Sequence, residues 1–334
     1  MQRATLDHIA QLAGVSKTTV SLILNNKAKQ NRISNLTLQK VKDVIIENDF
    51  IINNQAKCFR MNKSLTIGVI VPDLDNPFFA KIISNLENVG KEKDYLFLVG
   101  TTDDNEKKEE SVINRFLQHA VDGLIIVSAN EVPQKLPPTY ISTVYIDRKV
   151  KLDKAPSIVT NHKDAAKEIT TFLLKNQIED IWFLNGDENV ITSKERYKGF
   201  QEAFHNMNKK VNSRLVFNGK HNKESGYQLI KTAFANNSKQ PQCLFTTSWS
   251  LMEGVLEYLK QNNLLTSNLI LSTFDHNPLL DYFPLKSVSI QQDTFSIASK
   301  AFHTLFAMMN NEPYAIQHEI SAQIITRNFN KQKG

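Results

Sequence analysis

The sequence contains few cysteines and no long hydrophobic run. Its two cysteines, Cys58 and Cys243, stand far apart and lack the spacing of a disulfide framework or a metal site. No segment approaches the roughly 20 consecutive apolar residues of a membrane span, and the polar first residues do not resemble a signal peptide. We therefore expect a cytoplasmic protein that has no membrane segment and no metal.

Nucleotide-binding motifs are missing as well. Neither G-x-x-x-x-G-K-(S/T) nor G-x-G-x-x-G occurs, and the 8 histidines show no ligand spacing. The length of 334 residues, of which 41% are hydrophobic, suffices for a small domain followed by a body of two larger ones. We therefore expect no cofactor and no catalytic residues.

The first 24 residues have the pattern of two short helices joined by a tight turn. Gly14 tolerates the positive φ of such a turn, and Ser16 offers a side-chain oxygen that can cap the second helix. Apolar residues recur at intervals of three and four and predict one buried face for the first helix: Leu6, Ile9, Ala10 and Ala13.

The second helix carries polar residues on the side that faces away from this core. Val20 and Ile23 are expected to point inward, whereas Lys17, Thr18 and Ser21 point outward near the helix N-terminus. A helix of this kind is the recognition helix of a helix-turn-helix, which enters the major groove of DNA.

The net charge is concentrated beside this pattern. The first 64 residues hold 10 Lys and Arg against 4 Asp and Glu, so that the other 270 residues hold 30 of each sign and are neutral. A basic module on a neutral body is typical of a DNA-binding head, although a charge run alone more often marks a solvated surface.

The remainder of the basic segment predicts a third helix and a connection to the body. The third helix extends from Ser34 to about Asn48, and the loop before it carries Lys29 and Arg32 toward DNA phosphates. The segment 53–63 is either a plain linker or a helix that folds on binding. We predict a head over 1–50, a hinge over 51–64 and a core over 65–330.

Beyond Leu65 the pattern changes to continuous apolar strands that alternate with amphipathic helices. This alternation predicts an α/β core of two doubly wound lobes, in which helices cover both faces of parallel sheets. The expected strands are 65–71, 95–99, 123–127, 141–146, 158–160, 181–184, 214–217, 243–246, 270–274 and 319–325, and the expected helices 78–93, 105–119, 163–175, 195–207, 224–234, 251–262 and 296–309.

Ligands of such sheets bind in a cleft beyond the carboxyl ends of the strands. Carboxylates, arginines and an aromatic ring follow these ends and suit a polyhydroxylated ligand, with or without a phosphate group. For Trp249, a core position and stacking on a ligand are equally open. The effector-binding candidates are Asp73, Asn76, Phe78, Asp147, Arg148, Arg196, Ser248, Trp249 and Asp275.

Over nearly its whole length the chain resembles the LacI/GalR family of transcription regulators, which have a periplasmic-binding-protein-like core. The residues that carry this resemblance are 6–21 in the head, and 67–73, 144–148 and 272–275 in the body. Residues 26–34, 72–76 and 244–251 are similar to the subgroup of fructose repressors (Cra) and sucrose repressors.

The resemblance implies a repressor of sugar genes that acts as a homodimer, with a tetramer as the alternative. It implies release from operator DNA by fructose 1-phosphate, fructose or sucrose, with Lys17, Thr18 and Leu22 near bases. Phe59 replaces the leucine that wedges into the minor groove in the family, and Ile52 replaces a frequent proline. The candidate DNA contacts are Thr5, Ser16, Lys17, Thr18, Thr19, Ser21, Leu22, Lys29, Arg32, Ser34, Asn53 and Phe59.

Two other classes of protein remain as alternatives. A sugar receptor of the periplasmic type would explain the body but would need a signal peptide, and it would leave the basic head unexplained. An α/β enzyme acting on sugar phosphates could use Asp147 or Asp275 as a base, but no nucleophile, nucleotide or metal motif accompanies them.

Overall fold

The computed structural model describes residues 4–50 and 63–329, which form two separate compact units, Met1–Ser64 and Leu65–Gly334. Three residues singled out above, Ile52, Asn53 and Phe59, lie outside the described residues. The first unit is called the head and the second the core.

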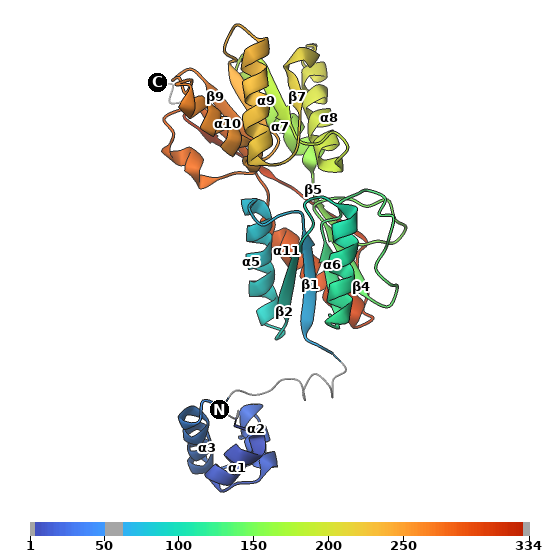
Figure 1. Cartoon of the computed structure of the whole chain (residues 1–334), viewed down its shortest axis with the longest axis vertical. Coiled ribbons are helices and arrows are strands. Elements are labelled where there is room, and N and C mark those ends of the chain that lie inside the picture. Colours follow the sequence, from blue (N-terminus) through green and yellow to red (C-terminus); the bar gives the residue numbers. More distant parts are fainter. Residues whose placement is uncertain (1–3, 51–62, 330–334) are drawn as a thin grey trace. The chain divides into compact units, whose positions relative to one another are not determined.

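The head contains three helices, α1 (Leu6–Ala13), α2 (Lys17–Leu24) and α3 (Asn35–Glu47), as predicted (Figure 1). Gly14 ends α1 with a φ of 66° and a ψ of 35°, the left-handed conformation that the turn requires. Val20 and Ile23 are buried against α1 and α3, which confirms the predicted inner face of α2.

The core contains two six-stranded sheets, each with helices on both faces (Figure 1). In the N-terminal lobe the strand order is β11-β5-β4-β3-β1-β2, and in the C-terminal lobe it is β12-β10-β9-β8-β6-β7. All neighbouring strands are parallel except β10 and β12. The predicted fold class is confirmed.

The N-terminal lobe is built mainly from the first half of the core. Helix α6 packs on one face of its sheet and α5 with α11 on the other. Its elements are β1 (Thr66–Val71), α5 (Pro77–Lys91), β2 (Leu96–Thr101), α6 (Glu106–Gln118), β3 (Gly123–Ile126), β4 (Ser142–Ile146), β5 (Ser157–Thr160), α11 (Thr294–Met309) and β11 (Gln317–Ile320).

The C-terminal lobe follows after the chain leaves β5. Helices α7 and α8 cover one face of its sheet, and α9 and α10 cover the other. Its elements are α7 (His162–Lys175), β6 (Ile181–Asn185), α8 (Ile191–Asn206), η1 (Ser213–Leu215), β7 (Val216–Asn218), α9 (Lys223–Asn236), β8 (Cys243–Thr246), α10 (Trp249–Gln261), β9 (Ile270–Phe274), η2 (Pro278–Tyr282), β10 (Ser287–Gln291) and β12 (Gln323–Arg327).

The end of the chain differs from the sequence-based expectation. The single terminal strand predicted over 319–325 is wrong: β11 belongs to the N-terminal lobe and β12 to the C-terminal lobe. Ser321 and Ala322 make this crossing, which is the third between the lobes after those near Asn161 and Gln292. Strand β10 was not predicted, because its run Ser287–Gln291 alternates serine with apolar residues although four of its five residues are buried.

One helix start also differs. Helix α8 begins at Ile191 rather than at Glu195, so that Arg196 lies inside the helix and not at its start. The residue before the helix, Val190, makes no side-chain cap, which removes the usual sequence signal for a helix start. Within the described residues, no helix combines the length and the apolar character that crossing a membrane requires.

Close packing of α9 on α10 depends on two glycines. A Cβ atom added at Gly254 would lie 1.9 Å from the backbone oxygen of Lys223, and one added at Gly226 would lie 2.1 Å from that of Leu251. Neither contact can be relieved by rotating a side chain, so the two helices would have to separate.

We therefore expect Gly254→Ala to lower the free energy of unfolding of the core by about 2 kcal/mol or more, despite a gain of about 1 kcal/mol in helix propensity. Gly90→Ala in α5 is the matched control, because its new Cβ meets the Phe97 ring, a side chain that can shift. Thermal melts would contradict the prediction if Gly254→Ala were as stable as Gly90→Ala.

Candidate functional site

The outer side of α2 presents polar groups to solvent. Lys17 and Thr18 are exposed, while Ser21 and Leu22 are half-buried beside them. Lys17 Nζ lies 2.7 Å from Asp7 Oδ2, but both side chains are more than half exposed, so this pair contributes little and can yield to a DNA phosphate or base.

Several of the candidate DNA contacts have a structural role in the head. Thr5, Ser16 and Ser34 are the N-caps of the three helices, and their hydroxyls accept hydrogen bonds from backbone N–H groups three residues on. The Ser16 hydroxyl also lies 2.9 Å from that of Thr19. Lys29 and Arg32 are exposed in the loop between α2 and α3. Asn53 and Phe59 lie outside the described residues, so their roles stay predictions.

In the core, the structure brings four of the candidate effector residues into one buried cluster between the two lobes. Asp147, Arg148, Arg196 and Asp275 expose 4–8% of their surface. The two carboxylates interact electrostatically with Arg196, which belongs to helix α8 of the C-terminal lobe. A set of charges this deeply buried is costly for the fold alone and is typical of a site for a polar ligand.

Arg148 is held by the N-terminal lobe. Its Nη1 donates to Asp104 Oδ1 at 2.6 Å and to the Ser128 carbonyl at 3.1 Å, and its Nε lies 3.8 Å from Asp147 Oδ2. Each of these groups follows the carboxyl end of a strand of the same sheet, as the topological rule predicts.

Arg196 is held by the C-terminal lobe. Its guanidinium lies 3.8 Å from the centroid of the Phe274 ring and donates to the Thr247 carbonyl. Its Nη2 lies 3.3 Å from Nδ1 of His162, whose Nε2 lies 3.1 Å from the Asp147 carbonyl. A His162 that is neutral and protonated on Nε2 satisfies both contacts, and it joins Arg196 to the opposite lobe.

Asp275 is connected to the crossings between the lobes. Its Oδ1 accepts from Gln292 Nε2 at 2.6 Å, and Gln292 Oε1 accepts from the Thr160 hydroxyl at 2.5 Å. The backbone N–H of Trp249 also donates to the Asp275 carboxylate. Both Asp147 and Asp275 have a positive φ, 64° and 69°, a strained conformation that is frequent at binding sites.

The electrostatics of the cluster reflect its burial. Burial raises the pKa of Asp147 to about 6, even though Arg148 and Arg196 act in the opposite direction, and burial also raises the pKa of Asp275. Burial and the nearby Arg196 lower the pKa of His162 and bring that of His221 down to about 3. Both histidines are therefore neutral at physiological pH.

Four polar atoms of the cluster are buried without a hydrogen-bond partner among the described residues: Asp147 Oδ1, Arg148 Nε, Arg196 Nε and His221 Nδ1. Buried polar atoms are rarely left unsatisfied, and each costs about 1–3 kcal/mol. One carboxylate acceptor and two guanidinium donors match a ligand that carries hydroxyl groups, and the donors also match a phosphate.

The other candidates contribute less directly. Asp73 and Asn76 form the turn before α5, where Asp73 Oδ1 accepts from Asn76 N and Asn76 Oδ1 accepts from Phe78 N. Ser248 caps α10. Trp249 packs its indole in the core of the C-terminal lobe and donates from Nε1 to Glu253 at 2.6 Å, which favours the core interpretation.

Several residues of the cluster were not among the sequence-based candidates. Asp104 follows β2, and the rule that nominated Asp147 could have found it. Gln292 follows β10, a strand that the sequence pattern did not reveal. His162 follows β5 and His221 follows β7, each within three residues of the strand end, so the same rule could have nominated them.

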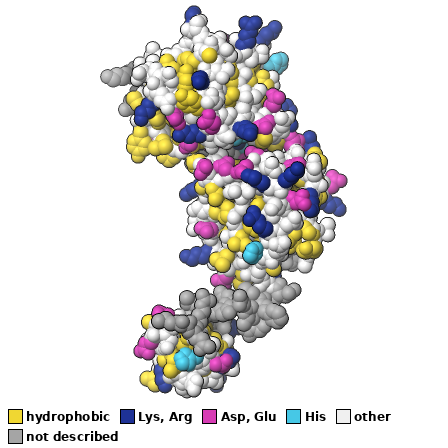
Figure 2. All heavy atoms as spheres, in the orientation of Figure 1, with side chains coloured by type: hydrophobic (Ala, Val, Ile, Leu, Met, Phe, Trp, Pro, Cys, Tyr) yellow, Lys and Arg dark blue, Asp and Glu magenta, His cyan; other side chains and the backbone are white. Residues whose placement is uncertain are grey.

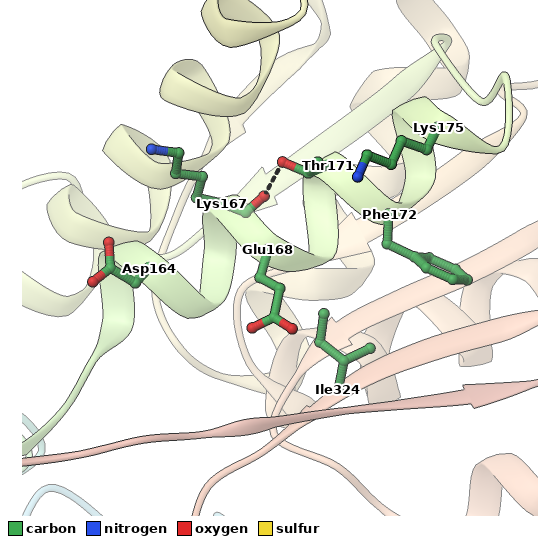
Figure 3. Close-up of a pocket in the computed structure, with 7 residues that line it drawn as sticks. All are labelled: Asp164, Lys167, Glu168, Thr171, Phe172, Lys175 and Ile324. Atoms are coloured by element: carbon green, nitrogen blue, oxygen red, sulfur yellow. Dashed lines mark hydrogen bonds between the residues drawn. The ribbon is translucent and has the colours of Figure 1, made fainter.

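A groove of about 480 Å³ opens elsewhere, between α7 and β12 (Figure 3). It is lined mainly by charged side chains of α7, together with Phe172 and Ile324, and the Thr171 hydroxyl donates to the Lys167 carbonyl at its wall. None of the candidate effector residues lines this groove. The buried cluster, rather than the groove, has the unsatisfied polar atoms expected of a ligand site.

The fold and the two sites define a DNA-binding protein with a ligand-binding core of the periplasmic-binding-protein type. Residues 5–53 match the model of bacterial regulatory proteins of the lacI family. Residues 64–311 match that of periplasmic binding proteins and the sugar-binding domain of the LacI family. The chain belongs to the LacI family of bacterial transcription regulators, as the motifs indicated.

Known regulators of sugar operons and catabolism are similar to this chain over most of its length. It is 30% identical to the sucrose operon repressor of Klebsiella pneumoniae, over 98% of both chains. It is 29% identical to the catabolite repressor/activator of Escherichia coli K12, over 91% of this chain and 92% of that one. The crystal structure of Cra from Pseudomonas putida in complex with fructose 1-phosphate matches with a TM-score of 0.72 and 26% identity, and covers 79% of this chain and 99% of that one.

The lac repressor dimer bound to operator shares the fold. Its TM-score is 0.77 at 18% identity, and the match covers 97% of this chain and 98% of the repressor. This match includes the head as well as the core, so both units of the chain have counterparts in one known protein.

Proposed function

We propose that this protein is a homodimeric repressor of fructose or sucrose genes that a sugar or sugar phosphate releases from its operator. The observation that carries the proposal is the pairing of two sites in one chain. An exposed polar recognition helix lies in the head, and a buried cluster with unsatisfied donors and acceptors lies between the lobes of the core. Operator binding would place the protein in the cytoplasm, with the DNA.

Dimerisation is supported by apolar side chains on the surface of the core. In the C-terminal lobe, Leu279 and Tyr282 of η2 are 53% and 83% exposed, and Figure 2 shows hydrophobic side chains gathered at the edge of this lobe. In the N-terminal lobe, Leu96 of the edge strand β2 is 72% exposed. Exposed apolar residues of this kind favour contact with a second copy of the chain.

The core residues support binding without turnover. Ser193 and His221 form a hydroxyl–imidazole pair at 2.9 Å, but none of the described residues gives His221 Nδ1 the acidic partner that would orient it as a base. We therefore propose that the ligand acts as an effector and not as a substrate. The ligand and the operator must then weaken each other's binding by the same factor.

Fluorescence polarisation with a panel of pseudo-palindromic operators at fixed salt tests the proposal. Binding should be sequence-specific, should weaken strongly when one half-site is scrambled, and should be reversed by fructose 1-phosphate, fructose or sucrose. Binding that no sugar alters would reject the effector assignment and leave the DNA function, while binding without sequence preference would reject both.

The head gives a sharper prediction on the same assay. Thr18→Ala should reduce discrimination between operators by about 5- to 150-fold, because a base contact is typically worth about 1–3 kcal/mol. The matched control is Thr37→Ala, in a helix that the proposal does not place in the groove. Equal operator preference in both variants would remove Thr18 from the recognition surface.

A further inference from the structure

The cluster between the lobes is closed in this structure. Asp147, Arg148, Arg196 and Asp275 are each at most 8% exposed, so a ligand can reach them only if the lobes move apart. Contacts that join the lobes outside the cluster therefore bear on how fast and how often the site opens. One such contact is the ion pair between Glu131 and Lys194, at the border of the cluster.

Glu131 supplies the carboxylate of this contact from the N-terminal lobe. It lies in the loop after β3, and its side chain is 10% exposed. Its two oxygens bind different lysines: Oε2 lies 2.7 Å from Lys151 Nζ and Oε1 lies 3.1 Å from Lys194 Nζ. The Lys151 N–H also donates to the Glu131 carbonyl at 2.7 Å, which fixes this loop against the loop after β4.

The two lysines come from different lobes. Lys151 belongs to the N-terminal lobe with Glu131, whereas Lys194 lies in the first turn of α8 in the C-terminal lobe. Lys194 follows Ser193, which contacts His221, and precedes Arg196 by two residues. A force on Lys194 therefore acts on the helix that carries Arg196.

We propose that Glu131 is a positioning residue for effector binding, because its ion pair with Lys194 holds the two lobes together at the border of the site. This proposal rests on the proposed function, since it assigns a means of controlling access to the same ligand site. Lys151 holds the carboxylate in place within its own lobe, and Lys194 completes the contact across the gap between lobes.

The pKa of Glu131 agrees with a carboxylate that is held by both lysines. Burial alone would raise the pKa of Glu131, but hydrogen bonds and charge from Lys151 and Lys194 outweigh it and lower the pKa. Glu131 is thus ionised at neutral pH and attracts both lysines. Because the lysines themselves are 70% and 50% exposed, salt should weaken the contact.

Hydrogen exchange followed by mass spectrometry on the effector-free full chain tests the proposal. In peptides that contain Asp147–Arg148 and Ser193–Arg196, Lys194→Gln should speed exchange about 2- to 5-fold at low salt, the range expected of a partly exposed ion pair. The difference from the unsubstituted protein should shrink at 0.5 M salt. Lys151→Gln is the matched control, because it removes a bond to the same carboxylate within one lobe.

Glu131→Gln removes the carboxylate charge from both lysines, so it should speed exchange in these peptides at least as much as Lys194→Gln. Equal exchange in Lys194→Gln and Lys151→Gln, or exchange in Glu131→Gln as slow as in the unsubstituted protein, would overturn the proposal. Because no sugar is used, this result is independent of the proposed function. Failure of all three sugars to release the operator would reject the effector assignment, but it would not change the measured effect of the ion pair between the lobes.

Discussion

Asparagine in place of Asp147 is expected to stabilise the effector-free core and to weaken its binding of sugar. Burial raises the pKa of this carboxyl from its ordinary 3.8 to about 6. At neutral pH the group is ionised in both states, and its buried charge destabilises the folded protein. That rise corresponds to roughly 3 kcal/mol. Asparagine is uncharged, has the same shape and accepts the φ of 64° at this position.

The pH dependence distinguishes this cause from better packing. Because the folded-state pKa of Asp147 lies above its unfolded value, the unsubstituted protein gains stability as pH falls from about 6 toward 3.8, whereas the asparagine variant does not. The advantage of Asp147→Asn should be greatest above pH 7 and should vanish near pH 4.

Thermal melts of both proteins across this pH range check the prediction, with Asp153→Asn as the control at an exposed aspartate. Titration with the releasing sugar should show weaker binding to Asp147→Asn than to the unsubstituted protein, since Asp147 Oδ1 is one of the unsatisfied acceptors. An Asp147→Asn protein that melts below the unsubstituted one at pH 7.5 would contradict the argument.

Local sequence signals were sufficient for the head. Its helices are short, and each begins at a hydroxyl residue and buries a face with a spacing of three and four, so that caps and periodicity are both visible in the chain. Local signals were also sufficient for five strands of the core, which are mostly apolar because helices cover both faces of their sheets: β1, β3, β6, β8 and β9.

The residues of the buried cluster could be predicted only where they follow recognisable strands. Asp147 and Asp275 could be nominated because each directly follows a recognisable strand, β4 or β9. Gln292 was missed because it follows β10, whose alternating serines do not form an apolar run. The split between β11 and β12 depends on where the chain crosses between lobes, which is a property of tertiary structure with no local pattern. Trp249 shows a related limit, since a strand end places its backbone at the site while its side chain turns into the core.

Lysine in place of Arg196 is expected to give a repressor that binds its operator but needs much more sugar for release. Lysine keeps the positive charge that Asp147 and Asp275 require, so the core should remain folded. It loses the planar guanidinium that lies over Phe274 and bonds to Thr247, and with it the free Nε donor. The loss of charge-assisted hydrogen bonds of about 1.5–3 kcal/mol corresponds to roughly 10- to 100-fold weaker sugar binding.

The measurement is operator polarisation as the releasing sugar is raised, with Arg115→Lys, an exposed arginine of α6, as the matched control. The Arg196→Lys protein should bind the sugar-free operator like the unsubstituted protein and should need 10- to 100-fold more sugar for release, in keeping with the weaker sugar binding. Release at an unchanged sugar concentration would remove Arg196 from the effector site. Because the head is a separate compact unit, a simultaneous loss of operator affinity would instead show that Arg196 is needed to keep the core folded.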